Sequence, residues 1–321
     1  LRNSSAASDV YKRQVVMNIR IATRKSELAL WQANHVAAIL AKLPEINQVT
    51  LVPLSTKGDQ ILDSSLQKIG GKGLFIKELE VAMNENIADI AVHSMKDMPV
   101  IMPQDFCIAA TLRRESPFDA LISKDNQKLK ELPIGAVIGS SSLRRQAQLL
   151  KMRPDIKVKG LRGNINTRLN KLDNREYDAI ILARAGLERL GLSGCITETF
   201  TAEEMLPAAA QGVIGIECLS KNHELKNLLQ QINNKQSEIT TNAERAVNRG
   251  LNASCQSPVG SYAIIENENC IIESIVATSD GTKILRKSIK GKIDEVREMG
   301  AKLAQQLIKN GASDLINNKW I

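Results

Sequence analysis

The sequence is poor in the residues on which metal sites, disulfide frameworks and base-stacking surfaces depend. It has three histidines, five cysteines and 3% aromatic residues, and no two cysteines form a CxxC pair. The histidine count leaves few ligands for a zinc site. An odd number of scattered cysteines is typical of reduced thiols, so we expect a cytoplasmic protein. The scarcity of aromatic side chains argues against binding single-stranded nucleic acid through stacked bases.

Long apolar runs and internal repeats are also missing from the sequence. No stretch approaches the roughly 18 apolar residues that a membrane-spanning helix needs, and no period recurs along the chain. With 43% hydrophobic and 24% charged residues, the composition is that of an ordinary globular protein. A length of 321 residues allows two or three domains, each with its own core. We expect no membrane partner.

Positive charge exceeds negative charge. The 43 Lys and Arg against 35 Asp and Glu give a net charge of +8. This excess predicts an anionic partner, which could be nucleic acid, an anionic surface or an acidic small molecule. Residues 1–16 carry part of it, show neither a helical nor a strand period, and lack the apolar segment of a signal peptide. They could be a transit peptide, but a non-native leader ahead of Met17 is the interpretation we favour.

The pattern of apolar runs predicts an α/β protein with a different C-terminal part. Short apolar runs alternate with helical patterns from Met17 onward, and the alternation restarts near Asp119, which predicts mostly parallel sheets with helices on both faces. After residue 235 a helix, antiparallel strands and a final helix predict a small α+β domain. We therefore divide the chain into a leader (1–16), domain 1 (17–112 and 213–230), domain 2 (118–206) and domain 3 (235–321).

Arginines follow the ends of predicted strands at three places. They are Arg24, the pair Arg144 and Arg145, and the pair Arg162 and Arg168. In open α/β sheets, ligands bind at the carboxyl ends of strands beside helix N-termini, and guanidinium groups bind carboxylates or phosphates bidentately. A solvated helix face would explain any one arginine equally well. Three such places together favour a pocket for a polyanion.

Two further residues and one loop have a position suited to chemistry. Asp97, beside Lys96, follows a predicted strand that ends at Val92; it could be a general acid or base, although position alone favours a turn cap. The loop 70–73 could hold an anion through backbone N–H groups or simply be mobile, since it matches no phosphate-binding spacing. Cys255 lies in a turn of small residues after a helix, which predicts an exposed, reactive thiol.

Seven motifs, in order from Met17 to the final helix, make the chain resemble the porphobilinogen deaminase family, also called hydroxymethylbilane synthases. They cover residues 20–32, 70–80, 91–97, 141–146, 161–164, 209–217 and 255–262. The resemblance implies two binding-protein-like lobes, doubly wound and hinged around a cleft, plus a small α+β C-terminal domain that bears a cofactor cysteine.

The resemblance also implies an activity. It implies a transferase that joins four porphobilinogen molecules head to tail, releases ammonia at each step and gives the linear tetrapyrrole hydroxymethylbilane for haem biosynthesis. A dipyrromethane cofactor, held by a thioether, would prime the growing chain. A cytoplasmic monomer with no metal, nucleic-acid or membrane partner is implied as well.

Individual residues take roles by this resemblance. Cys255 matches the attachment residue, and Asp97, supported by Lys96, matches the catalytic carboxylate. Cofactor binding is implied for Arg144, Arg145, Lys96, Ser94 and Ser142, and substrate binding for Arg24, Ser26, Gln32, Arg162 and Arg168. Lys72 and Phe75 match a loop over the cleft. Ala253, Ser254 and Asn166 stand where the family often has glycine.

Two other classes of function share some of these features. A non-catalytic anion receptor would use the same lobes and arginines, but it would not need Asp97 and Cys255 together. A nucleic-acid-binding protein would suit the net charge of +8, but neither a basic run nor a basic patch with interleaved aromatics is present.

Overall fold

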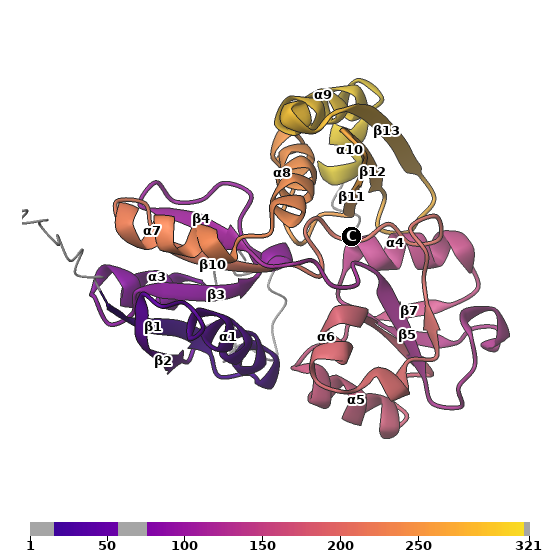
Figure 1. Cartoon of the computed structure of the whole chain (residues 1–321). Helices are drawn as coiled ribbons and strands as arrows, with labels where there is room; N and C mark the ends of the chain where they lie inside the picture. The colour runs from indigo at the N-terminus through magenta and orange to yellow at the C-terminus, as the bar shows by residue number, and fades with distance from the viewer. Residues whose placement is uncertain (1–15, 57–75, 318–321) are drawn as a thin grey trace, which may run out of the picture.

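A computed structural model describes residues 16–56 and 76–317 of the chain. This part contains two five-stranded sheets and one three-stranded sheet, arranged as two lobes and a C-terminal unit (Figure 1). Within these ranges no helix combines the length and the apolar character that crossing a membrane requires. Most of the leader 1–16, the loop 70–73, Lys72 and Phe75 lie outside the described residues. The expected fold class, two α/β lobes and a small α+β unit, is confirmed.

Lobe 1 is built on a sheet with the strand order β2-β1-β3-β10-β4. Its strands are β1 (Met17–Arg24), β2 (Ile46–Leu54), β3 (Ile90–Ser94), β4 (Phe106–Thr111) and β10 (Ile214–Leu219), and its helices are α1 (Glu27–Leu40), α3 (Lys77–Asn84) and α7 (His223–Leu229). The alternation of side chains along β1 places Ile21 among the apolar residues of α1 and α7 and places Ala22 against α3. Helices therefore cover both faces.

Lobe 2 repeats this plan with the order β7-β6-β8-β5-β9. Its strands are β5 (Asp119–Ser123), β6 (Val137–Gly139), β7 (Lys157–Lys159), β8 (Ala179–Ala183) and β9 (Glu198–Thr199), and its helices are α4 (Leu143–Met152), α5 (Ile165–Asp173) and α6 (Arg184–Arg189). Leu149 of α4 packs on one face beside Ile181, and Leu172 and Leu187 pack on the other beside Ile180. Each of these fully buried side chains contributes about 1.5–3 kcal/mol.

The strand that enters each lobe from the other lobe runs antiparallel to its neighbours. β10 is antiparallel to β3 and β4, and β5 is antiparallel to β8 and β9, whereas β1–β2, β1–β3, β6–β7 and β6–β8 are parallel. The expectation of mostly parallel sheets was therefore too simple. The physical reason is that the chain re-enters each lobe at the edge where the parallel strands end, so it must run back through the sheet.

Two crossing segments, 112–118 and 200–213, connect the lobes, and we refer to this connection as the hinge. They touch at Gly212, whose φ is +90° and whose added Cβ would lie 2.5 Å from the Glu115 carbonyl oxygen. Only glycine adopts this backbone without strain and leaves room for the second segment. The Glu115 N–H also donates to the Gly212 carbonyl at 3.2 Å.

The C-terminal unit is an antiparallel sheet, β11-β12-β13, with helices on one face. It comprises α8 (Lys235–Gly250), β11 (Val259–Glu266), β12 (Asn269–Ala277), β13 (Ile284–Lys292), α9 (Val296–Lys309) and α10 (Ala312–Asn317). The sequence did not predict the separate helix α10. The described part of the chain as a whole also has the short 3₁₀ helices η1 (Met95–Asp97), η2 (Leu129–Glu131), η3 (Ser193–Cys195), η4 (Gln230–Ile232) and η5 (Ile293–Glu295). In Figure 1 the unit lies next to the hinge and α4.

Candidate active site between the lobes

The predicted site residues of lobe 1 lie at or just after the carboxyl ends of its strands. Arg24 is the last residue of β1, and Ser94 is the last residue of β3. Gln32 of α1 is buried and donates from Nε2 to the Ser94 hydroxyl at 2.8 Å. Ser26 occupies the N-cap position of α1, but its hydroxyl makes no capping hydrogen bond. Lobe 1 thus brings two of the predicted residues, Gln32 and Ser94, into direct contact.

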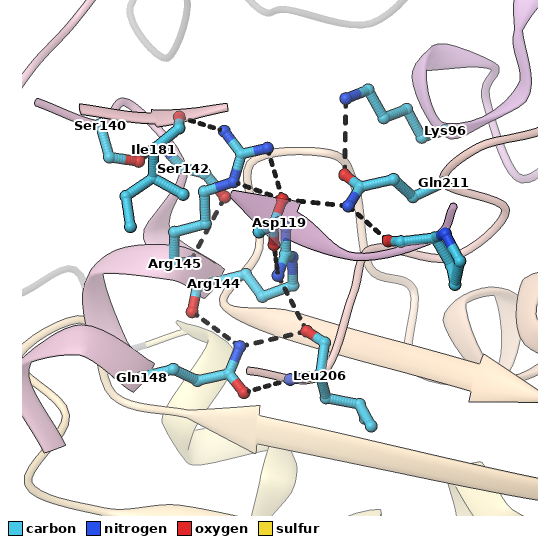
Figure 2. A network of polar contacts seen from close by, with 11 residues as sticks. Lys96, Asp119, Ser140, Ser142, Arg144, Arg145, Gln148, Ile181, Leu206 and Gln211 are labelled. Atoms are coloured by element: carbon cyan, nitrogen blue, oxygen red, sulfur yellow. Dashed lines mark hydrogen bonds and ion pairs between the residues drawn. The ribbon is translucent and has the colours of Figure 1, made fainter. Parts of the chain in front are cut away.

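Arg144 and Arg145 begin α4 after β6, and both are anchored from inside lobe 2 (Figure 2). Arg145 donates to Asp119 Oδ1 from Nε at 3.0 Å and from Nη2 at 2.7 Å, and to the Ile181 carbonyl from Nη1 at 3.0 Å. Arg144 Nη1 lies 2.8 Å from Asp119 Oδ2 and donates to the Leu206 carbonyl. Burial opposes the charge of Asp119, but the two arginines outweigh it and hold the pKa of this carboxyl well below its usual range.

This anchoring does not use up the donors of Arg145. A guanidinium has five N–H groups, and three of those of Arg145 are engaged within the described part of the chain. Ser142, at the N-cap of α4, accepts from the Arg145 backbone N–H and fixes the start of the helix. The pair of arginines is therefore held in place before any ligand binds.

Gln211 connects this buried network to lobe 1. Its Nε2 donates to Asp119 Oδ1 at 3.0 Å and to the Pro117 carbonyl at 2.6 Å, while its Oε1 accepts from Lys96 Nζ at 3.5 Å (Figure 2). Burial lowers the pKa of Lys96 to about 8; the charge of Asp97 acts against this and that of Arg145 adds to it. The positive charges of Arg145 and Arg144 in lobe 2 thus act on the Lys96 ammonium in lobe 1.

Asp97 is exposed at the end of η1 and acts electrostatically on residues of both lobe 2 and the C-terminal unit. Burial, then the like charge of Arg145, lowers the pKa of Arg168 to about 10; Asp97 opposes this, and Arg162 adds to it. Desolvation by the surrounding residues raises the pKa of the Cys255 thiol, and the negative charge of Asp97 raises it further. Asp97 is therefore close enough to Cys255 to affect the protonation of its thiol.

The turn around Cys255 is held by serine hydroxyls. The Ser254 N–H donates to Ser257 Oγ at 3.0 Å, and the Gln256 N–H donates to Ser254 Oγ at 3.2 Å. Ala253 is buried, whereas the Cys255 side chain is exposed. Ala253 and Ser254, where the family often has glycine, are accommodated while the thiol stays accessible.

The segment 161–168 combines a glycine turn with an interlobe contact. Gly163 has a φ of +106°, which permits the sharp turn into α5, and its carbonyl accepts from Arg168 Nε at 2.7 Å. Asn166 lies in the first turn of α5 and donates from Nδ2 to Glu27 Oε2 of lobe 1 at 2.5 Å. Asn166 therefore leaves the helix intact and bridges the two lobes.

Comparisons with known families assign the chain. Residues 19–227 match the model described as "Porphobilinogen deaminase, dipyromethane cofactor binding domain", and residues 239–309 match "Porphobilinogen deaminase, C-terminal domain". The chain belongs to the porphobilinogen deaminase family. The resemblance seen in the motifs is thereby confirmed, as is the dipyrromethane cofactor, because the first matched domain is the one that binds it.

The donor set of this family member fits that cofactor. A dipyrromethane carries several carboxylates. Burial lowers the pKa of Lys96 and of Arg168, and the positive charge of Arg145 adds to both shifts. Anions placed among these groups would relieve their mutual repulsion. The thiol of Cys255 is exposed, and the charge of Asp97 acts both on this thiol and on Arg168.

Several solved structures are similar to this porphobilinogen deaminase family member. The VFT2 domain of BvgS from Bordetella pertussis has 14% identity, covers 67% of this chain and 86% of its own, and has a TM-score of 0.42. A probable amino-acid ABC transporter extracellular-binding protein, YtmK from Bacillus subtilis, has 12% identity, covers 68% and 90%, and has a TM-score of 0.41. The sulfate-bound OxyR2 regulatory domain of Vibrio vulnificus has 13% identity, covers 70% and 97%, and has a TM-score of 0.40. At such scores the family models remain the evidence for the assignment.

The sequence interpretation missed three residues that organise the site. Asp119 was expected only as the start of a strand, and Gln211 only as part of a motif. Glu244 of α8 is fully buried; it accepts from Arg114 Nη1 at 2.5 Å and from the backbone N–H of Ala210 at 2.5 Å. Glu244 thus ties the C-terminal unit to both crossing segments. No local pattern signals these roles, because each partner comes from a distant part of the sequence.

Proposed function

We propose that the protein is a hydroxymethylbilane synthase that condenses four porphobilinogen molecules head to tail and releases one ammonia per step. The observation that carries this proposal is the meeting of three kinds of group between the lobes: the carboxylate of Asp97, the thiol of Cys255, and the cationic cluster of Arg145, Arg162 and Arg168. An anion receptor needs only the third. The product assigned by this proposal is hydroxymethylbilane, which serves tetrapyrrole and haem biosynthesis.

Cys255 is proposed to hold the dipyrromethane through a thioether. Its exposure, and the serine-bonded turn that presents it, support this role. When bound, the cofactor supplies the pyrrole end to which the first substrate unit is joined. The raised pKa keeps an unoccupied Cys255 largely protonated at neutral pH, which limits its side reactions.

Asp97 is proposed to act on the ammonia-releasing step. The amine of porphobilinogen leaves as ammonia when it is protonated, and positive charge then develops on the pyrrole that remains. A carboxylate beside the pyrrole N–H stabilises this charge and moves protons. The exposure of Asp97 and its electrostatic influence on both Cys255 and Arg168 support this placement.

The cationic groups are proposed to bind the substituents of the pyrrole rings. Each porphobilinogen carries an acetate and a propionate, so each condensation adds two negative charges to the cleft. Arg145 has unused N–H groups, and Arg162 and Arg168 project from the neighbouring segment of lobe 2. Arg24, Ser26 and Gln32 are proposed to bind the incoming substrate from lobe 1, and Ser94 and Ser142 to support the cofactor.

We also propose the boundaries of the domains, the oligomeric state of the protein and its location in the cell. We assign domain 1 to residues 17–112 and 213–230, domain 2 to 118–206 and domain 3 to 235–321. A monomer in the cytoplasm is the expected state. Gel filtration with light scattering would report the mass of the assembly directly.

Intact-mass measurement tests the proposal. Protein made in cells that produce porphobilinogen is expected to carry a covalent addition of two pyrrole units, and Cys255→Ala is expected to lack it. Cys195→Ala is the matched control, because Cys195 is half-buried in lobe 2, away from the cleft residues, and should leave the addition in place. Wild-type protein that carries no addition and releases no ammonia from porphobilinogen would leave the anion-receptor function as the better explanation.

A further inference from the structure

Two cysteines of lobe 1 face each other across neighbouring strands. Cys107 of β4 and Cys218 of β10 are direct partners in the antiparallel register, and their Sγ atoms are 3.9 Å apart. Directly opposed residues of such strands have Cα atoms about 4.5–5.5 Å apart, which lies within the range that a disulfide spans. A change of side-chain rotamer is therefore enough to bring the sulfurs into bonding distance.

The two thiols differ in access and in acidity. β4 is the outer strand of its sheet, and Cys107 is half-buried, whereas Cys218 is fully buried. The hydrogen bond with Cys218 lowers the pKa of Cys107; burial and the charge of Glu217 oppose this, and the Lys226 ammonium and the Ser220 hydroxyl add to it. The same pairing and burial raise the pKa of Cys218. Because Cys107 is the more accessible of the two thiols, it is the one that a peroxide reaches first, with Cys218 directly beside it.

The remaining described cysteines lack this arrangement. Burial raises the pKa of Cys195 and of Cys270, and neither has a cysteine partner within the described part of the chain. Partly exposed thiols in an electropositive setting, with a second thiol in reach, are the ones that oxidants select. Cys107 meets all of these conditions.

We propose that Cys107 and Cys218 form a reversible oxidation site, at which hydrogen peroxide converts the two thiols into a disulfide between β4 and β10. In the first step the Cys107 sulfur attacks one peroxide oxygen: an S–O bond forms, the O–O bond breaks, and the leaving oxygen departs as water after taking a proton. In the second step the Cys218 sulfur attacks the sulfenic sulfur of Cys107. The S–S bond forms, the S–O bond breaks, and the hydroxyl leaves as water with the proton of Cys218.

The position of the pair sets the consequence of this oxidation. β4 leads into the crossing segment 112–118, and β10 begins directly after the crossing segment 200–213. Cys107 is the second residue of β4 and Cys218 is the fifth residue of β10, so a disulfide between them joins the ends of these strands that lie farthest from the crossing segments. Cys218 pairs with Ile90 at the start of β3, whereas Ser94 ends that strand. The effect of the bond is therefore expected on the pairing of β4 with β10 rather than on the chemistry at Asp97.

Peptide mapping of the full-length protein tests this proposal without relying on enzymatic activity. The protein is treated with a small excess of hydrogen peroxide, blocked with a maleimide and digested without reductant. A cross-linked peptide containing Cys107 and Cys218 is expected, formed faster than any oxidation of Cys195 and removed by dithiothreitol. Absence of that peptide while Cys107 remains a free thiol, or oxidation of Cys195 at the same rate, overturns the proposal.

Variants assign the two steps. In Cys218→Ala, Cys107 is expected to accumulate as sulfenic acid, which a dimedone probe traps, and no cross-link forms. In Cys107→Ser, Cys218 should stay unmodified over the same time, while Cys195→Ser should cross-link like the wild type. Because the wild-type measurement stands alone, a variant that fails to fold does not remove the test.

Discussion

Arg145 donates two hydrogen bonds to a single oxygen of Asp119, from Nε at 3.0 Å and from Nη2 at 2.7 Å. Arg144 takes the other carboxylate oxygen, and Asp119 is fully buried. One carboxylate therefore fixes two arginines whose partners on the ligand side would be the carboxylates of the pyrrole rings. Such a buried cluster is sensitive to the loss of any member, because an unpaired buried charge is strongly destabilising.

Asp119→Asn tests the structural role of this cluster. Removing the charge leaves Arg144 and Arg145 buried beside a neutral amide, so we expect a loss of about 3–5 kcal/mol in the free energy of unfolding. Urea denaturation measures this loss. Asp155→Asn, which breaks the solvent-exposed pair with Arg153, should leave the midpoint almost unchanged. Equal effects of the two variants would contradict the assigned role.

The same carboxylate should make stability depend on acid. The pKa of Asp119 is lower in the folded protein than in the unfolded chain, so the unfolded chain takes up the proton first and acid favours unfolding. The contribution of Asp119 is complete above the unfolded pKa of about 3.9 and is lost as the pH falls below it. The stability difference between wild type and Asp119→Asn should therefore shrink from pH 5 to pH 3. A constant difference would argue that Asp119 is not charged at neutral pH.

Asp97→Asn is expected to reduce turnover of porphobilinogen by about 10²–10⁴-fold, the usual contribution of a general acid or base. The side chain is exposed at the end of η1, so the thermal midpoint should not change. Asp105→Asn, at another exposed position of lobe 1, is the matched control and should keep full turnover. Retention of turnover by Asp97→Asn would remove this residue from the chemistry.

Lys96 should titrate far below ordinary lysines. In Cys255→Ala, which is expected to lack the cofactor, the pKa of Lys96 is lowered to about 8, so its amine should become reactive near that pH. A lysine model peptide, whose amine has the usual pKa of about 10.4, is the reference. Competitive acylation across pH 6–11, read by mass spectrometry, compares the two directly. Titration of Lys96 together with the model peptide would mean that Lys96 is not shielded from water.

Glu244→Gln is expected to loosen the C-terminal unit. The change leaves the Arg114 guanidinium in a buried position without its carboxylate, which should cost about 3–5 kcal/mol of stability. Limited proteolysis should then cut the connection near residues 230–236 faster than in the wild type. Glu266→Gln breaks only the exposed pair with Lys290 and should cleave at the wild-type rate.

The sequence predicted the elements whose signals are local. The alternation that restarts near Asp119 begins with β5 at Asp119–Ser123, and the helix expected after residue 235 is α8 at Lys235–Gly250. Residues 106–111 were not expected as a strand, although they form β4. The order of the strands and the antiparallel entry of β5 and β10 depend on where the chain crosses between lobes, which no local pattern encodes.

In the candidate site, too, the sequence predicted the features with a local signal and missed those that depend on distant partners. Strand-end arginines and the turn around Cys255 could be found by position, because ligands gather at the carboxyl ends of strands. The partners of these residues could not: Asp119 meets Arg145 across 26 positions, and Gln211 meets Asp119 across 92. Such pairs become visible only when the sheet and the hinge bring distant segments together.

Glu244 accepts hydrogen bonds from the Arg114 side chain in one crossing segment and from the Ala210 backbone in the other. The C-terminal unit is thus mounted at the pivot of the molecule, where a rotation of the lobes displaces atoms least. Cys255 would then hold nearly the same place whether the cleft is open or closed. The attachment point at Cys255 would then stay in place during the reaction. The space for the growing pyrrole chain would depend on how far the two lobes move away from this cysteine.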